Sequence, residues 1–163
     1  MSVAETALKY VGKTEKPGNM GFTDADFEKR MLAVGFVKSH AWCCYFAELV
    51  FKEALPEKFA ELDKLFSASC VQTFNNFSTA NYKISLIPTV GTLAIWQSVR
   101  DGRPLITGHA GIVVTAISPT QFSSVEGNTT EGGSREGFIV GENFHTVRTN
   151  VLTGKKLLGF ITL

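Results

Sequence analysis

Cys43 lies where a loop gives way to a helix. The loop contains Ser39 and His40, and residues 43–55 then repeat apolar side chains at three- and four-residue steps. A cysteine in the first turn of a helix faces unpaired backbone N–H groups and the positive end of the helix dipole, which favour the thiolate over the thiol. Because the thiolate is the nucleophilic form, we predict that Cys43 attacks a substrate.

A thiol nucleophile needs a base that takes its proton and a third group that orients the base. The chain has three histidines. We predict that His109 is the base, because it begins a strongly apolar strand and has a small residue on either side. Two alternatives stay open. His145 is expected on the strand face opposite Phe144, and His40 lies in the loop just before Cys43.

Glu126 is the candidate for the orienting group. Residues 110–117 and 121–125 are predicted to form an antiparallel hairpin across the turn at 118–120. Pairing about that turn would place His109 and Glu126 opposite each other or nearly so, where the carboxylate can accept an N–H from the imidazole. The competing interpretation is a surface glutamate at the end of a strand.

The other two cysteines are predicted to be packing residues. Cys44 is turned by about 100° from Cys43 around the helix, so only one of the two can face the sheet edge. Cys70 is interpreted as a small buried residue like Cys44. Three cysteines without a CxxC pair or the Cys/His spacing of a zinc site predict neither a disulfide framework nor a metal centre. We expect no cofactor.

The elements that must position these residues change type along the chain. Helical periodicity comes first, and short strands rich in branched and aromatic residues begin near residue 84. This order predicts a single α+β domain over 1–163, with N-terminal helices packed on one face of an antiparallel sheet of about five to six strands. Helices are predicted at 2–11, 24–34, 43–55 and 56–66, strands at 93–96, 110–117, 122–126, 137–140, 144–149 and 157–162, and 69–81 is left as helix or loop.

Composition excludes several classes of function. Apolar residues are 44% and charged residues 19% of the chain, as in a globular protein, and the net charge of +1 predicts no nucleic-acid partner. The apolar runs are too short to span a bilayer, so we expect no membrane insertion. No secretory signal is visible at the N-terminus, so we expect another export route or a trimmed leader. The glycine-rich stretch 131–137 lacks phosphate-binding spacing and is interpreted as a mobile loop.

Six stretches, taken in order, resemble the CHAP domain, a branch of the papain-like NlpC/P60 superfamily of peptidoglycan hydrolases. The resemblance covers about residues 5–163. The stretches and the family patterns that they resemble are 15–21 (EKPGNMG, "E-x-P-x-N-x-G"), 41–46 (AWCCYF, "pWCaaF"), 88–96 (PTVGTLAIW, "P-x-x-G-D" and a strand ending in Trp), 108–113 (GHAGIV, "GHvGiV"), 125–129 (VEGNT, "iEGNt") and 158–161 (LGFI, the last strand).

The resemblance implies a papain-like fold with Cys43 as nucleophile, His109 as base, Glu126 as its orienting residue and Asn128 as an accessory polar group. It implies cleavage of the stem or cross-bridge peptide of peptidoglycan, by an N-acetylmuramoyl-L-alanine amidase or an endopeptidase. Asn19, Trp42, Trp96 and Asn128 are candidates for the cleft walls, although a tryptophan is also a common core residue.

The sequence departs from the family pattern at three places. Cys44 stands where relatives usually have Ala or Gly, and Thr92 stands where many have Asp, so Thr92 receives no role. Some relatives bind calcium through an acidic loop before the cysteine. The acidic residues here follow a helix-like pattern instead, so no calcium is expected; they are Asp24, Asp26 and Glu28.

The expected site of action is the bacterial cell wall. Without a visible signal or wall-binding domain, the protein could be a phage endolysin, a virion-associated hydrolase or a secretion-system effector with a cognate immunity protein. A monomer is expected. Two other functions stay open. One is a catalytically silent wall-binding module that kept the fold, and the other is a deamidase or transglutaminase-like enzyme that uses the same three residues on protein substrates.

Overall fold

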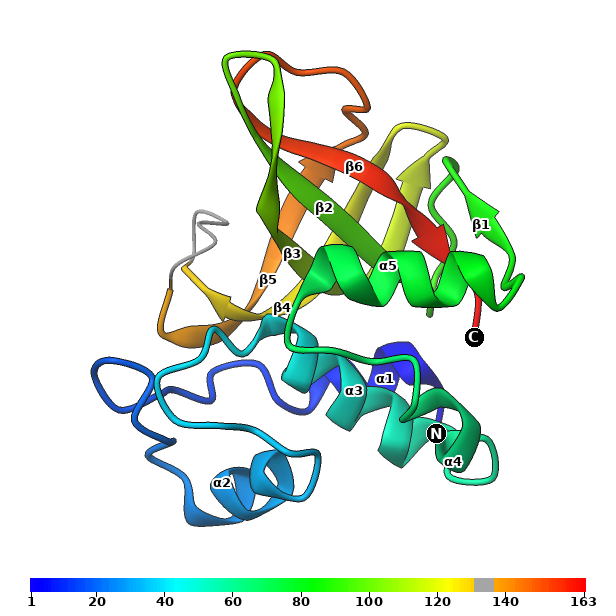
Figure 1. Ribbon diagram of the computed structural model, residues 1–163. Helices are drawn as coiled ribbons and strands as arrows, with labels where there is room; N and C mark the ends of the chain where they lie inside the picture. The colour runs from blue at the N-terminus through cyan, green and yellow to red at the C-terminus, as the bar shows by residue number, and fades with distance from the viewer. Residues whose placement is uncertain (131–136) are drawn as a thin grey trace.

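The computed structural model describes residues 1–130 and 137–163. Within these ranges the chain forms five helices followed by one six-stranded antiparallel sheet (Figure 1). The predicted α+β class, with helices preceding an antiparallel sheet, is therefore confirmed. Residues 131–136 of the glycine-rich stretch, for which we predicted a loop, lie outside the described residues.

Three of the five described helices begin at a polar residue whose side chain caps the helix. Ser2 and Glu5 form a capping box at the first helix, and the Asp24 carboxylate accepts a 2.8 Å hydrogen bond from the Phe27 N–H at the second. Ser69 caps a helix in the stretch that we left as helix or loop. The helices are α1 (Val3–Leu8), α2 (Ala25–Leu32), α3 (Cys43–Ala54), α4 (Phe59–Leu62) and α5 (Cys70–Thr79).

The strands run in the order β1-β6-β2-β3-β4-β5. Two predictions are corrected. The strands expected at 137–140 and 144–149 are one strand, because Glu142 and Asn143 pair with β4 instead of forming a turn. A short strand that we did not predict, β1, pairs with β6. The strands are β1 (Ile84–Ser85), β2 (Leu93–Arg100), β3 (Arg103–Ser118), β4 (Gln121–Thr129), β5 (Ile139–Thr146) and β6 (Gly154–Ile161).

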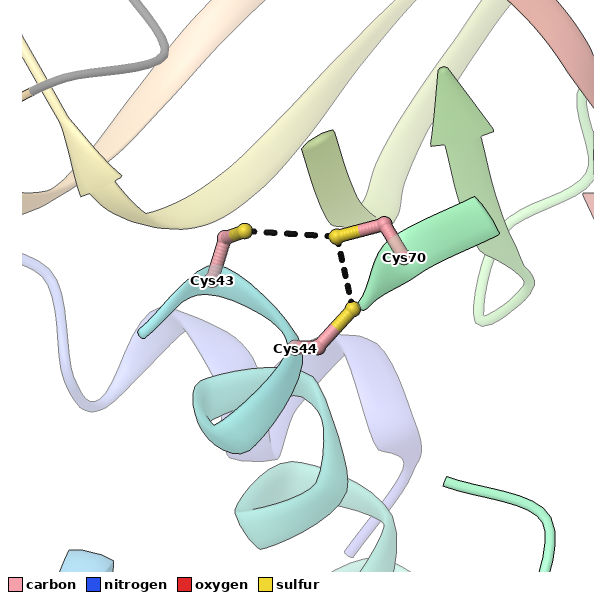
Figure 2. Close-up of side chains that lie close together, drawn as sticks. All are labelled: Cys43, Cys44 and Cys70. Atoms are coloured by element: carbon pink, nitrogen blue, oxygen red, sulfur yellow. Dashed lines mark hydrogen bonds between the residues drawn. The ribbon is translucent and has the colours of Figure 1, made fainter. Parts of the chain in front are cut away.

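Helices α3 and α5 begin beside one another. Cys43 and Cys44 are the first two residues of α3, Cys70 is the first residue of α5, and their side chains meet between the two helix starts (Figure 2). Gly108 of β3 lets the start of α5 lie close to the sheet, because a Cβ there would lie 3.3 Å from the Cys70 Cβ. The fold thus joins segments that are 27 residues apart in the chain.

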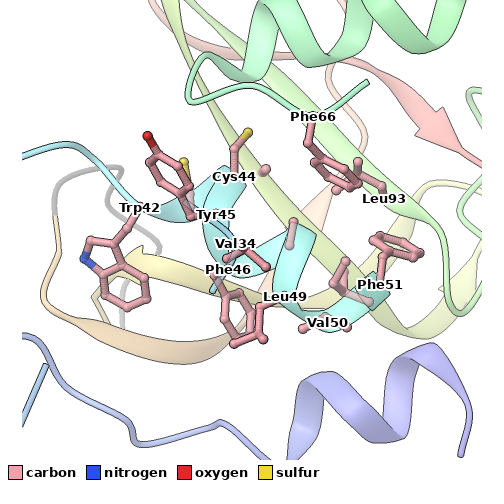
Figure 3. Close-up of a cluster of buried hydrophobic side chains, with 14 of the residues drawn as sticks. Val34, Trp42, Cys44, Tyr45, Phe46, Leu49, Val50, Phe51, Phe66 and Leu93 are labelled. Carbon is pink, nitrogen blue, oxygen red and sulfur yellow. The ribbon is translucent and has the colours of Figure 1, made fainter. Parts of the chain in front are cut away.

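Helix α3 is the centre of the core. Every residue from Cys43 to Phe51 is buried, including Glu48, so the helix is not the one-sided amphipathic helix that its spacing predicted. Figure 3 shows several of its apolar side chains in the core, among them Phe46, Leu49 and Phe51. A helix covered on all sides is typical of a molecular interior. Here α1 and α2 cover it on one side and strands β3 and β4 on the other.

The sheet is buried on both faces at its centre. Ile95, Ile112 and Val125 belong to the main core with α3, whereas Trp96 and Phe122 belong to a smaller second core. Alternation along the strands separates the two sets. No helix in the described part of the chain combines the length and the apolar character needed to cross a membrane.

Candidate active site

Cys43 occupies the first helical position of α3, after Trp42. Trp42 makes no side-chain capping bond, and its carbonyl accepts the first helical hydrogen bond, from Phe46 N–H, at 2.9 Å. The N–H groups of the first turn therefore have no side-chain acceptor at the N-cap. They and the helix dipole present positive charge to the Cys43 sulfur.

His109 connects Cys43 to Glu126. Its Nε2 lies 2.7 Å from Glu126 Oε2, and its buried Nδ1 has no hydrogen-bond partner among the described residues. Burial alone would lower the pKa of His109, but interactions with Cys43 and Glu126 raise it to about 9. The Nδ1 is thus the imidazole atom that is free to exchange a proton with the Cys43 sulfur.

The same contacts favour the thiolate of Cys43. The neighbouring thiols of Cys44 and Cys70, and then His109, hold the pKa of Cys43 well below its usual value despite the opposing effect of burial. A lowered thiol pKa beside a raised imidazole pKa gives a thiolate–imidazolium pair at neutral pH.

Glu126 is a fully buried carboxylate whose oxygens are both occupied. Oε2 accepts hydrogen bonds from His109 and, at 3.4 Å, from Thr129; Oε1 accepts from Ser124 at 2.7 Å and from His145 at 2.5 Å. Burial would raise its pKa, but the hydrogen bonds from the two histidines bring it well below the usual value. Because an ionised carboxylate only accepts hydrogen bonds, both histidines donate from Nε2.

The β3–β4 hairpin brings His109 and Glu126 together. Ile112 pairs with Val125, and continuing this register places Glu126 diagonally across from His109 on one face of the sheet. Gly111 lies between them. A Cβ at this position would come within 2.7 Å of the Glu126 Cγ, so the glycine leaves the room through which Glu126 reaches His109.

The sequence offered His145 only as an alternative to His109 and did not reveal its contact with Glu126. It lies on the face opposite the exposed Phe144, as alternation predicted, and that face also carries Glu126. Its side chain is 14% exposed and its ring centroid is 4.9 Å from that of Trp96. The available signal was the period-two pattern, which places residue 145 on the same face as residues 143 and 141, beside β4.

The two tryptophans are core residues. Trp42 is fully buried, packs edge-on against Phe22, and donates an indole N–H to Glu15 at 2.5 Å. Our prediction that Trp42 lines an open cleft is wrong, because its place before α3 directs the ring into the core. Trp96 is also buried, and its ring centroid lies 6.0 Å from that of His109.

Asn19 and Asn128 line one cavity, of about 490 Å³, which also contains Glu15, Ala41 and Phe138. The other predicted histidine alternative, His40, lies in an exposed loop with Nδ1 3.1 Å from the Tyr45 hydroxyl.

A second cavity, of about 350 Å³, opens at Cys43. Cys43, Cys70, Ile106 and Gly108 are among its lining residues, and Ala41 lines both cavities. The two cavities therefore meet the loop before α3 at the same residue, Ala41.

The sequence also missed the contact of three sulfur atoms. The Cys43 and Cys70 sulfurs are 3.4 Å apart, and the Cys44 thiol donates to the Cys70 sulfur at 2.7 Å (Figure 2). Cys44 and Cys70 are buried, as expected of packing residues, yet both of them lower the pKa of Cys43.

No protein-family model, curated protein or solved structure matches the chain. The chemistry of the three side chains therefore indicates what reaction the site supports. A thiolate at a helix start, an imidazolium beside it and a buried carboxylate behind the imidazole are the parts needed for acyl transfer through a thioester.

Proposed function

We propose that the protein is a papain-like cysteine hydrolase that cleaves an amide bond in the peptide part of peptidoglycan. The observation that carries the proposal is the connected series Cys43, His109 and Glu126, in which the carboxylate is buried, ionised and hydrogen-bonded to the imidazole. A purely structural glutamate would not need two histidine partners, one fully buried and one partly buried.

In the proposed mechanism, the Cys43 thiolate attacks the amide carbonyl carbon. The resulting oxyanion accepts hydrogen bonds from backbone N–H groups at the start of α3, including that of Cys43. His109 then gives its Nδ1 proton to the nitrogen of the leaving amine, and the carbon–nitrogen bond breaks. Water, deprotonated by His109, attacks the thioester and releases the carboxylic acid together with the Cys43 thiolate.

The substrate class is supported by the resemblance of the ordered motifs to the CHAP domain. The larger cavity adds a physical reason, because polar residues that include Asn19 and Ser39 line it, as expected of a site for a peptide backbone. In this proposal the protein acts on the bacterial wall, as an endolysin, a virion-associated hydrolase or a secreted effector. The cleaved bond is either the N-acetylmuramoyl-L-alanine amide or one within the stem or cross-bridge.

The test is mass spectrometry of purified peptidoglycan after digestion. We expect the wild-type protein to release new amino and carboxyl termini, whose masses identify the bond. The variants Cys43→Ser and His109→Ala should release none, whereas the control His40→Ala should match the wild type. Undiminished cleavage by Cys43→Ser would refute the proposal.

The same digestion distinguishes the two alternatives. Retention of the wild-type protein on insoluble peptidoglycan without any new termini would indicate a silent wall-binding module. Release of ammonia from glutamine side chains of a test protein, again without new wall termini, would indicate a deamidase that uses the same residues.

A further inference from the structure

Two cysteines near the nucleophile have no part in the proposed reaction. The sulfur atoms of Cys43, Cys44 and Cys70 all lie within 4.8 Å of one another, and Figure 2 shows them turned toward a common centre. All three residues are buried and free of disulfide bonds. Packing alone does not require three sulfurs in one place, since apolar side chains of similar size would fill the same space.

The surroundings of the cluster favour negative charge on sulfur. Two helices of at least ten residues, α3 and α5, both begin at the cluster and direct their positive ends toward it. Three sulfurs this close together repel one another when they are all negatively charged, so a cation is needed to hold them as three thiolates. Burial and the neighbouring Cys43 raise the pKa of Cys44 well above its usual value, and the two neighbouring cysteines and burial do the same for Cys70.

A cation with affinity for sulfur would remove this limit. Three thiolates and one divalent ion carry a net charge of −1, which both helix starts stabilise. Among the described residues the three sulfurs are the only group of possible ligands that lie close enough together, so a solvent molecule would take the fourth position of a tetrahedral ion. The cavity lined by Cys43 and Cys70 provides a path for the ion.

We propose that Cys43, Cys44 and Cys70 form a binding site for a thiophilic divalent cation of the Zn²⁺ type. Zinc–sulfur bonds of about 2.3 Å in a tetrahedral site place sulfurs about 3.8 Å apart. The Cys43–Cys70 separation of 3.4 Å is close to that value, and the Cys44–Cys70 separation of 2.7 Å must open by about 1 Å. Sequence spacing did not predict the site because one ligand comes from another helix.

Ion binding would block the proposed reaction, because the ion would hold the sulfur lone pair that attacks the substrate. This consequence rests on the proposed function, whereas the binding itself does not. Binding also displaces the protons of the Cys44 and Cys70 thiols, so affinity should fall as the pH is lowered.

The test is a titration of the phosphine-reduced, oxygen-free protein with Cd²⁺, followed by the ultraviolet charge-transfer band of thiolate–metal bonds. We expect the band to saturate at one ion per chain, and Zn²⁺ to displace Cd²⁺. Cys44→Ala and Cys70→Ala should each weaken binding by about a hundredfold or more, because even the loss of a residue that only supports a ligand costs about ten- to a hundredfold.

Controls separate binding from folding and from catalysis. Cys70→Ser preserves the volume of the side chain and serves if Cys70→Ala does not fold, as judged by circular dichroism. His40→Ala should bind the ion like the wild type. The absence of a charge-transfer band, an unchanged affinity in folded Cys70 variants, or a Cys44–Cys70 disulfide that persists under reductant would each overturn the proposal. A charge-transfer band in the loaded protein, together with no peptidoglycan cleavage by the metal-free protein, would support the ion site while refuting the proposed function.

Discussion

At the scale of single residues, the site is organised around Glu126 as much as around Cys43. Its two carboxylate oxygens accept hydrogen bonds from four side chains, which leaves no acceptor position idle. A buried charge is stable only when it is paired and hydrogen-bonded in this way. The saturated carboxylate fixes the imidazole of His109 and keeps it protonated beside Cys43.

The first prediction concerns the pH dependence of cleavage. Activity should be lost at low pH, where Cys43 becomes a thiol, and again above about pH 9, where His109 loses its proton. In Glu126→Gln the carboxylate that raises the pKa of His109 is absent, so the alkaline limb of kcat/KM should move to lower pH. Alkaline limbs at the same pH in both proteins would contradict this role of Glu126.

The second prediction concerns His145, which we infer to be a positioning residue for Glu126. His145→Phe removes one donor to Oε1 while it keeps an aromatic ring beside Trp96. We expect kcat to fall about tenfold with little change in KM, consistent with about 1.4 kcal/mol of lost transition-state stabilisation. His145→Gln, which retains a donor, should restore most of kcat. Equal kcat values for the two variants would argue against positioning.

At the scale of elements, the site depends on close contacts that only glycine permits. Helix α3 lies directly against β4, and a Cβ at Gly127 would lie 2.6 Å from the Phe46 Cβ and 2.7 Å from the Trp42 ring. Real Cβ contacts are never this short, so either the helix or the strand would have to move. Because Cys43 is carried by the helix and Glu126 by the strand, such a shift would separate the parts of the site.

The third prediction follows from this contact. Gly127→Ala should lower the free energy of unfolding by about 1–3 kcal/mol through overpacking, measured by urea denaturation. The control is Gly141→Ala, on the neighbouring strand. The nearest atom to a Cβ there is the Thr129 methyl carbon at 3.2 Å, so this variant should be milder. If the two variants were equally stable, the close packing of α3 on β4 would not hold.

The sequence predicts local features of these elements better than their contacts. Asp24 and Ser2 mark helix starts because capping is a local interaction, and the β3–β4 hairpin follows from one turn and its alternation. The single strand β5 was not predicted, because its pairing with β4 outweighs the turn-forming character of Gly141 and Asn143. The contact of Cys70 with Cys43 depends on where α5 packs, which no local pattern encodes.

At the scale of the whole molecule, the helices and the sheet enclose α3 so completely that a charged residue is buried with it. Glu48 is 7% exposed, and burial, followed by the neighbouring Asp63, raises its pKa to about 8. The periodicity of residues 43–55 placed Glu48 on a polar face. The tertiary structure overrides that pattern because neighbouring elements cover the helix on both sides.

The fourth prediction is a pH-dependent stability that originates at Glu48. Between about pH 4.5 and 8 the unfolded chain releases the Glu48 proton while the folded protein keeps it, so stability should fall as the pH rises. Glu48→Gln removes this contribution. Between pH 5 and pH 8 the free energy of unfolding of the wild type should therefore fall by roughly 3 kcal/mol more than that of the variant. Urea denaturation at both pH values measures the effect. Glu57→Gln, at an exposed position, is the control. If the stability of Glu48→Gln depended on pH in the same way as that of the wild type, Glu48 would not be the origin of the effect.

The rate at which iodoacetamide alkylates Cys43 at pH 6, measured by peptide mass spectrometry, tests most directly whether Cys43 is an activated thiolate. An activated thiolate should react much faster than a cysteine in the denatured chain, whose thiol with a pKa of about 8.5 is almost entirely protonated at that pH. In His109→Ala the rate should fall but stay above that of the denatured chain, because the Cys44 and Cys70 thiols still lower the pKa of Cys43. A native Cys43 that reacts no faster than the denatured one, with or without His109, would contradict the account.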